Sequence, residues 1–268
     1  MTTPIPNILL LKEKAKTHSD PYETHFTELK FNCMFVPVLE HCLTHLEDLR
    51  SMLNNTGEDY AGMVVTSKRA VDALSQVWQS LDTTVKQRWI ERQVFTVGPS
   101  TANLVRELGL RSVGETSGCA QRLGQEIIQQ LQDDQKPVKL LFLVGDKRRD
   151  ELPMMMKNAS IIMDEILVYE TQLRKDLEDA IQDTITTLSQ PNWVVVFSPS
   201  GSKALDILYH HLQRKSYSKP RIAAIGQTTS KHLKDRGYKV DAVADKPDAY
   251  YLREAVLQSM DKGFDSRW

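Results

Sequence analysis

Hydroxyl, glycine and basic residues gather in five short segments of the sequence that could bind an anion. The segments read TSKR at 66–69, GPST at 98–101, GDKRR at 145–149, SPSG at 198–201 and GQTT at 226–229. Serine and threonine hydroxyls, backbone N–H groups and basic side chains are the donors that carboxylates and phosphates accept from. Because these donors are spread over five segments, they suit a ligand that carries several anionic groups.

The candidate binding residues in these segments either carry a donor or leave the backbone accessible. They are Thr66, Ser67, Arg69, Gly98, Thr101, Gly145, Arg149, Ser198, Ser200, Gly201, Gly226, Thr228 and Thr229. A single serine or threonine at such a place has a plainer explanation, because these residues often cap helices without binding a ligand. Five such segments together favour an anion-binding cleft.

Other kinds of site find little support in the sequence. Neither G-x-G-x-x-G nor G-x-x-x-x-G-K-[ST] occurs, so a dinucleotide or P-loop nucleotide site is not expected. The segment at 198–201 lacks the G-x-S-x-G pattern of a nucleophile elbow. His41 and His45 fall in a stretch that we expect to be helical, but no third ligand accompanies them. We therefore expect no metal and no organic cofactor.

Each of the five segments lies between a predicted buried strand and a predicted helix. The strands are short apolar runs, GMVVT, VFTV, LLFLV, WVVVF and IAAI, and the helices show apolar residues at helical spacing. Ligands of parallel sheets bind beyond the carboxyl ends of the strands, where helix N-termini direct N–H groups at them. This order of elements therefore places all five segments where a ligand would bind.

The chain contains an internal duplication with a period of about 130 residues. VFTVGPST at 94–101 is echoed by IAAIGQTT at 222–229, and both following helical patterns stop at a glycine, Gly109 and Gly237. The repeated alternation of strand and helix predicts two similar doubly wound α/β domains of about five parallel strands. Two extended segments at equivalent places, Cys33–Glu40 and Ile161–Thr171, could cross between the domains. Residues 133–137 have the composition of a linker.

Composition and charge indicate an ordinary globular protein. The chain has 268 residues, of which 41% are hydrophobic and 26% charged, a length that suits about two domains. The net charge of −1 does not favour nucleic-acid binding. The three cysteines, Cys33, Cys42 and Cys119, form no CxxC pair, which favours free, buried thiols in a reducing compartment. The apolar run Ile8–Leu11 is too short for a signal peptide or membrane span. We expect a cytoplasmic protein with no membrane partner.

Nine short motifs together resemble the uroporphyrinogen-III synthase family along essentially the whole chain. None is specific alone, but their order and spacing are those of the family. The motifs are LLLK at 9–12, DPY at 20–22, VPVL at 36–39, TSKRAV at 66–71, VGPST at 97–101, GET at 114–116, VYET at 168–171, FSPSG at 197–201 and AAIGQTT at 223–229. Gln227 stands where the family usually has proline, and Lys68 lies at a variable position.

The resemblance implies two flavodoxin-like domains joined by two extended strands, with one domain formed from both chain ends. Domain one would comprise residues 1–38 plus 174–268 and domain two residues 39–173, with a substrate cleft between them. The implied reaction of heme biosynthesis cyclises hydroxymethylbilane, a linear tetrapyrrole with eight carboxylates, to uroporphyrinogen III with loss of water and inversion of ring D. The implied enzyme is a lyase that needs no cofactor, and we expect a monomer.

Tyr169 coincides with the family's tyrosine in VYxT, which implies that its phenol assists departure of the hydroxyl group. A tyrosine in a strand more often only packs, so the role rests on the resemblance. The alternative function is a non-catalytic two-domain binding protein for a small polycarboxylate or other anion. A glycosyltransferase-like enzyme is a third possibility, disfavoured by the missing nucleotide motifs.

Overall fold

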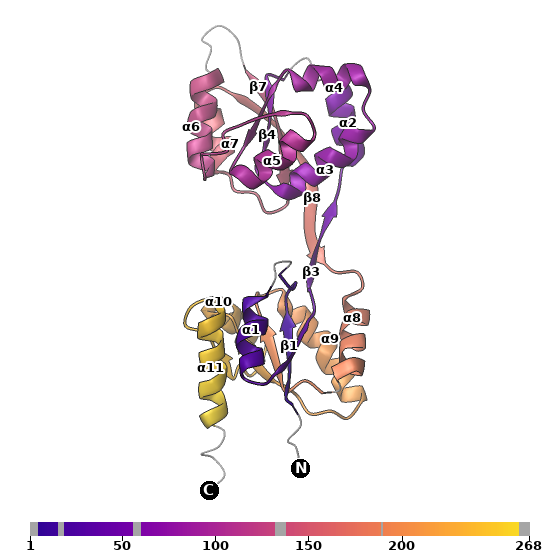
Figure 1. Cartoon of the computed structure of the whole chain (residues 1–268), viewed down its shortest axis with the longest axis vertical. Helices are drawn as coiled ribbons and strands as arrows, with labels where there is room; N and C mark the ends of the chain where they lie inside the picture. The colour runs from indigo at the N-terminus through magenta and orange to yellow at the C-terminus, as the bar shows by residue number, and fades with distance from the viewer. Residues whose placement is uncertain (1–4, 16–18, 56–59, 132–137, 189, 263–268) are drawn as a thin grey trace. The chain divides into compact units, whose positions relative to one another are not determined.

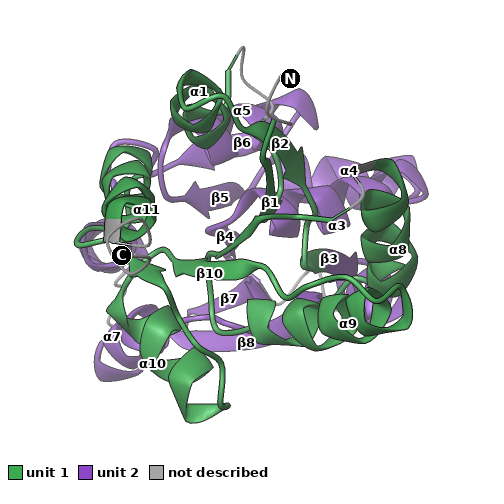
Figure 2. Ribbon diagram, turned by 90° about the horizontal axis from the view of Figure 1, so that it is seen from below, with its two compact units in different colours: residues 1–40, 173–268 green, residues 41–172 purple. Residues whose placement is uncertain are grey.

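The computed structural model describes all residues except 1–4, 16–18, 56–59, 132–137, 189 and 263–268, so the expected linker at 133–137 lies outside the described residues. The chain divides into two compact units, coloured separately in Figure 2. Unit 1 comprises Met1–Glu40 and Leu173–Trp268, and unit 2 comprises His41–Gln172. Each has its own sheet and its own cores.

Unit 1 contains a five-stranded sheet in the order β11-β10-β9-β1-β2, and each described strand pair is parallel. Helices α1 and α11 cover one face and α8 and α9 the other (Figure 1). The elements are β1 Asn7–Leu11, α1 Pro21–Glu28, β2 Asn32–Phe35, α8 Leu177–Leu188, β9 Trp193–Val196, α9 Gly201–Arg214, β10 Arg221–Ala224, α10 Gln227–Asp235, β11 Ala242–Val243 and α11 Ala249–Lys262.

Unit 2 contains a six-stranded sheet in the order β3-β8-β7-β4-β5-β6. Apart from β3, the order is again that of a flavodoxin-like sheet, with β7 in the place that β1 has in unit 1. The elements are β3 Leu39–Leu43, α2 Leu46–Asn55, β4 Gly62–Val65, α3 Lys68–Gln79, α4 Thr83–Ile90, β5 Gln93–Thr96, α5 Pro99–Glu107, β6 Arg111–Val113, α6 Ala120–Leu131, β7 Lys139–Gly145, α7 Glu151–Asn158 and β8 Ile162–Leu173.

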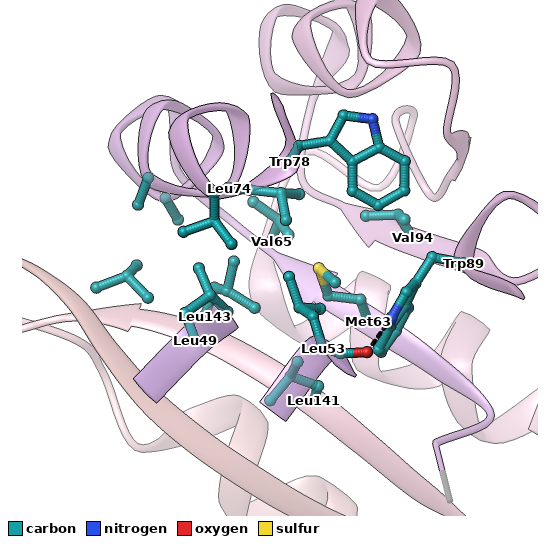
Figure 3. Packing of buried hydrophobic residues seen from close by; sticks show 14 of the residues in the cluster. Leu49, Leu53, Met63, Val65, Leu74, Trp78, Trp89, Val94, Leu141 and Leu143 are labelled. Atoms are coloured by element: carbon teal, nitrogen blue, oxygen red, sulfur yellow. Dashed lines mark hydrogen bonds between the residues drawn. The ribbon is translucent and has the colours of Figure 1, made fainter. Parts of the chain in front are cut away.

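The strands of unit 2 are continuously apolar because both faces of its sheet are covered. Met63, Val65 and Val94 belong to one core and Val64 and Phe95 to the other. Figure 3 shows the first core, in which the fully buried Trp89 donates from Nε1 to the backbone oxygen of Leu53 at 3.2 Å. Packing and a satisfied indole N–H therefore hold this core together.

The two sheets exchange halves of the sequence repeats. β1 and β2 come from the first repeat, yet they pair in one sheet with β9, β10 and β11 of the second. β7 and β8 of the second repeat likewise share a sheet with β4, β5 and β6 of the first. The predicted fold class of two similar α/β domains with parallel sheets is confirmed. Each structural unit combines strands from both sequence repeats.

The predicted strand Cys33–Glu40 is wrong as a single element. It divides into β2 and β3, which belong to different sheets, and Pro37 lies between them. Proline has no N–H for a ladder hydrogen bond, so a continuous strand is not favoured there. The sequence also predicts a helix over 43–53, but β3 runs to Leu43 and the helix α2 begins at Leu46.

The two extended strands are where the chain passes between the units. The boundaries fall after Glu40, inside β3, and after Gln172, one residue before β8 ends. Thr44 N donates to Val168 O and Arg174 N donates to Val38 O, each at 3.0 Å, so the two strands run antiparallel. Among the described residues, β8 pairs within the six-stranded sheet, and Ile161–Thr171 lies wholly in unit 2, so this predicted segment does not itself cross.

The glycines that end the two echoed helices take the predicted conformation. Gly109 follows α5 with a φ of 78°, and Gly237 follows α10 with a φ of 84°. The cysteines are free, but Cys33 and Cys42 are only half-buried and Cys119 is exposed, contrary to the expectation of buried thiols. Among the described residues, no helix is long and apolar enough to span a membrane.

Candidate active site

In unit 1, the segments after β9 and β10 lie at the carboxyl edge of adjacent strands. Ser198 and Ser200 are half-buried, and their hydroxyl oxygens are 2.7 Å apart. Gly201 is the first residue of α9, and a Cβ there would lie 2.6 Å from Cγ1 of Val196. Gly201 therefore permits close packing of helix on strand. One serine hydroxyl donates to the other, which leaves the second O–H group available to a ligand.

The two threonines of the second segment do not cap α10, contrary to the sequence interpretation. They lie inside its first turn, and the N-cap is Gly226, whose φ of 175° is extended backbone. A Cβ on Gly226 would meet no atom within 4 Å. Thr228 is exposed and free to contact a ligand, whereas Thr229 is buried at 4% exposure. The accessible groups here are thus the hydroxyl of Thr228 and the backbone at Gly226.

In unit 2, the segment after β4 behaves partly as a helix cap. Ser67 accepts a hydrogen bond from Ala70 N at 3.2 Å, so its capping role is confirmed. Thr66 is half-buried beside it. Arg69 is exposed and forms an ion pair with Asp72 at 3.3 Å. Arg69 is therefore accessible to an anion at the surface of this edge.

The segment after β5 differs in backbone from its echo in unit 1. Gly98 has a φ of 84°, a conformation that side chains rarely adopt, and precedes Pro99 at the start of α5. Thr101 lies within the helix at 5% exposure. Gly98 and Gly226 occupy equivalent places in the repeats but adopt different backbone conformations. Thr101, like Thr229, is buried in the protein interior.

Gly145 lies against the ring of Tyr169 and not against open solvent. β7 and β8 pair with a bulge that sets Gly145 opposite Tyr169. A Cβ on Gly145 would lie 2.5 Å from Cε2 and 2.6 Å from Oη of the tyrosine. Arg149 is exposed. The sequence predicts a helix over 147–158, but α7 begins only at Glu151, so the predicted start is wrong. This segment is a longer turn whose glycine accommodates a phenol.

Three residues that the sequence did not single out surround Tyr169. The ring of His41 meets the phenol ring edge-on at 6.2 Å between centroids. Nδ1 of His41 lies 3.2 Å from Oγ1 of Thr171. Asp146 N donates to Tyr169 O, and an Asp146 side-chain oxygen accepts from Thr171 N, both at 3.2 Å. The main chain around Tyr169 is therefore tied to the turn after β7.

His41 could not be placed by its position in the sequence. It lies in β3, not on a helix as expected, and only the pairing of β3 with β8 brings it to Tyr169. His45 has a φ of 50° just before α2. Within the described parts of the chain, no group of three or more His, Cys, Asp or Glu residues could hold a metal ion.

A second feature that the sequence did not single out as a site lies at the end of β1. Lys12 Nζ donates to Oδ2 of the fully buried Asp20 at 2.5 Å. Burial alone would raise the pKa of Asp20. Hydrogen bonds from Lys12 and from the amides of Ala15 and Tyr22, with the charge of Lys12, outweigh it and lower the pKa below its usual value. Asp20 is therefore an anion with a fixed cationic neighbour.

The candidate residues fall into two groups, one at the carboxyl edge of each sheet. Unit 1 carries Ser198, Ser200, Gly201, Gly226, Thr228 and Thr229, and unit 2 carries Thr66, Ser67, Arg69, Gly98, Thr101, Gly145, Arg149 and Tyr169. Each edge presents hydroxyls and backbone N–H groups at helix N-termini, a chemistry suited to carboxylates.

Comparison with known proteins identifies the family of this chain. The family model described as "Uroporphyrinogen-III synthase HemD" matches residues 20–252. Uroporphyrinogen-III synthase of Saccharomyces cerevisiae is 35% identical, over 93% of this chain and 94% of the relative. That of Schizosaccharomyces pombe is 32% identical, over 93% and 95%.

A solved structure with this fold is uroporphyrinogen-III synthetase from Helicobacter pylori. It aligns with a TM-score of 0.52 at 16% identity, covering 94% of this chain and 99% of that one. At that identity the likeness concerns the fold, whereas the family assignment rests on the family model and the two yeast sequences. The chain belongs to the uroporphyrinogen-III synthase family.

Proposed function

We propose that this enzyme converts hydroxymethylbilane to uroporphyrinogen III. Water is lost from the hydroxymethyl carbon, and the macrocycle closes with ring D inverted. Because the substrate closes spontaneously without inversion to the type I isomer, the enzyme mainly controls orientation. Family membership along nearly the whole chain carries this proposal.

The proposed catalytic residue is Tyr169. Its phenol can donate a hydrogen bond to the departing hydroxyl oxygen. The fixed backbone around it supports this role, because Asp146 and Thr171 tie β8 to the turn after β7. The contact with Gly145 restricts where the ring can lie. A donor held in this way loses little freedom when the substrate binds.

The proposed binding groups are the donors at the two carboxyl edges. Eight carboxylates require many partners, and the accessible ones are Thr66, Arg69, Arg149, Ser198, Ser200 and Thr228, with backbone N–H groups near Gly98 and Gly226. Ser67, Thr101, Thr229, Gly145 and Gly201 act by shaping the turns that present these donors. We propose that the donors at each edge bind carboxylates of the substrate.

The test supplies freshly prepared hydroxymethylbilane and measures the ratio of type III to type I product after oxidation to porphyrins. We expect predominantly type III product with the protein and type I without it. A ratio equal to the protein-free control would reject the synthase function. Tight binding of a polycarboxylate without selectivity would instead favour the alternative, a non-catalytic anion-binding protein.

Two further expectations accompany this function. The protein is a monomer, since duplication already supplies two sheets in one chain, and sedimentation velocity would reveal any dimer. Its compartment is the cytoplasm, which a fluorescent fusion would test.

A further inference from the structure

We propose that Lys12 forms a carboxylate-binding subsite in unit 1, used by one acidic side chain of the tetrapyrrole substrate. This inference rests on the proposed function and extends its binding machinery to a residue outside the five segments. Lys12 directly follows β1, a central strand of the sheet. Its position at the carboxyl edge is the one where parallel sheets bind ligands.

The register of the sheet places Lys12 beside Phe197, the residue that precedes the serine pair. Leu11 lies opposite Val196, so the next residue of each strand, Lys12 and Phe197, are neighbours. Ser198 follows immediately, and its hydroxyl is already paired with that of Ser200. The ammonium of Lys12 and the serine hydroxyls therefore belong to the carboxyl ends of two paired strands, which is the edge where a carboxylate would bind.

Aromatic rings from α1, from β2 and from the residue after β9 surround the ammonium. Nζ of Lys12 lies 5.1 Å from the ring centroid of Tyr22, 5.2 Å from that of Phe35 and 5.8 Å from that of Phe197. The rings of Tyr22 and Phe197 meet edge-to-face at 4.8 Å. Cations are attracted to such ring faces, so the long lysine side chain is confined before any ligand arrives.

Asp20 fixes the ammonium without saturating it. The carboxylate accepts hydrogen bonds from Lys12 Nζ, from Ala15 N at 2.9 Å and from Tyr22 N at 3.0 Å. Three donors therefore stabilise its negative charge. An ammonium has three N–H donors, and Asp20 takes one. The Lys12 side chain remains 21% exposed, so its charge can reach a ligand. The arrangement resembles a preorganised anchor, which suits recognition of one carboxylate.

A purely structural ion pair is the competing explanation, and paired substitutions separate the two. Lys12→Met alone leaves Asp20 buried without its partner, which can unfold the protein. In the double variant Lys12→Met with Asp20→Asn both charges are removed, and asparagine keeps an oxygen for the Tyr22 amide and remains a good N-cap. Circular dichroism would verify that the double variant is folded.

The measurement is steady-state formation of uroporphyrinogen III from hydroxymethylbilane. We expect the double variant to raise KM about tenfold, because the substrate loses one charged hydrogen bond. We also expect KM of the double variant to rise less steeply with salt concentration than KM of the wild type. Lys14→Met is the matched control, because Lys14 carries the same charge two residues along but is 51% exposed and paired with Glu23. It should change KM less than about twofold.

Three results would overturn the subsite. A double variant with the wild-type KM would show that the pair is only structural. An equal effect of Lys14→Met would show a general effect of surface charge. If the wild-type protein fails to form type III product, the proposed function fails instead, and binding of uroporphyrin III followed by fluorescence then tests Lys12 directly. In that case, equal affinity of the wild type and the double variant would reject the inference.

Discussion

Gly145 and Tyr169 are in direct contact across the bulge between β7 and β8. A Cβ on Gly145 would lie 2.5 Å from Cε2 and 2.6 Å from Oη of the phenol. The main chain of Tyr169 is itself held in place, because its carbonyl oxygen accepts a hydrogen bond from Asp146 N. The glycine is therefore required by the position of the tyrosine, and this contact links a backbone residue to the proposed chemistry.

Gly145→Ala should displace the Tyr169 ring and lower kcat for type III formation by about tenfold to a hundredfold, because catalysis is sensitive to misplacement of this size. The measurement is initial rate and isomer ratio. A double-mutant cycle with Tyr169→Ala supplies the control, since no ring then remains to be displaced. Equal losses from Gly145→Ala with and without the tyrosine ring would show that the glycine acts elsewhere.

Tyr169→Phe should lower kcat about a hundredfold, within the range of a proton donor, while KM changes little. The phenylalanine ring keeps the packing against His41, so folding should be unaffected. Tyr60→Phe is a matched control in the same unit, because its hydroxyl donates to Asp164 and not to the proposed site. Unchanged turnover and selectivity in Tyr169→Phe would return the residue to a packing role.

Gly109→Ala and Gly237→Ala should each destabilise the protein by about 1–2 kcal/mol, because both glycines have the left-handed conformation at a helix end. Urea unfolding followed by circular dichroism measures this cost. Gly226→Ala serves as the stability control, since its backbone is extended and the space around it is open. A cost for Gly226→Ala equal to that of the other two would contradict the conformational explanation.

The stability of unit 2 should fall with acid through Asp164. Burial would raise the pKa of Asp164, but hydrogen bonds from Lys139 and Tyr60 and the charge of Lys139 lower it below its usual value of 3.8. A lowered folded-state pKa stabilises the protein above the unfolded value, and this contribution is lost as pH falls through the folded pKa. Asp164→Asn should therefore reduce the loss of unfolding free energy below about pH 4. Parallel pH curves for variant and wild type would argue against this contribution.

Much of the fold is readable in the sequence because its signals are local. A buried parallel strand needs a continuous apolar run, and a helix end in the left-handed conformation needs glycine, as at Gly109 and Gly237. The cap at Ser67 follows in the same way. The expectation that Thr228 and Thr229 cap a helix was wrong, because α10 begins at Gln227 with Gly226 as its N-cap. The residue types alone do not determine at which residue the helix starts.

The proposed site was only partly predictable for a related reason. The segments after the strands were found, since each is a short stretch of the chain. The neighbours of Tyr169 and Lys12 were not, because His41, Phe35 and Phe197 reach them through strand pairing between distant parts of the chain. Spacing along the sequence carries no direct signal of such contacts.

The order of residue types is enough to predict the repeating unit of this protein, a strand that ends in a small-residue turn and continues into a helix. It does not predict which strands share a sheet, which is seen only in the folded chain. After β2 the chain passes Pro37 and enters the other sheet as β3, and it returns at the end of β8. An apolar run predicts that a strand is buried, but it does not predict which other strands pair with it. Partners follow from the packing of whole sheets, which also brings Gly145 against Tyr169.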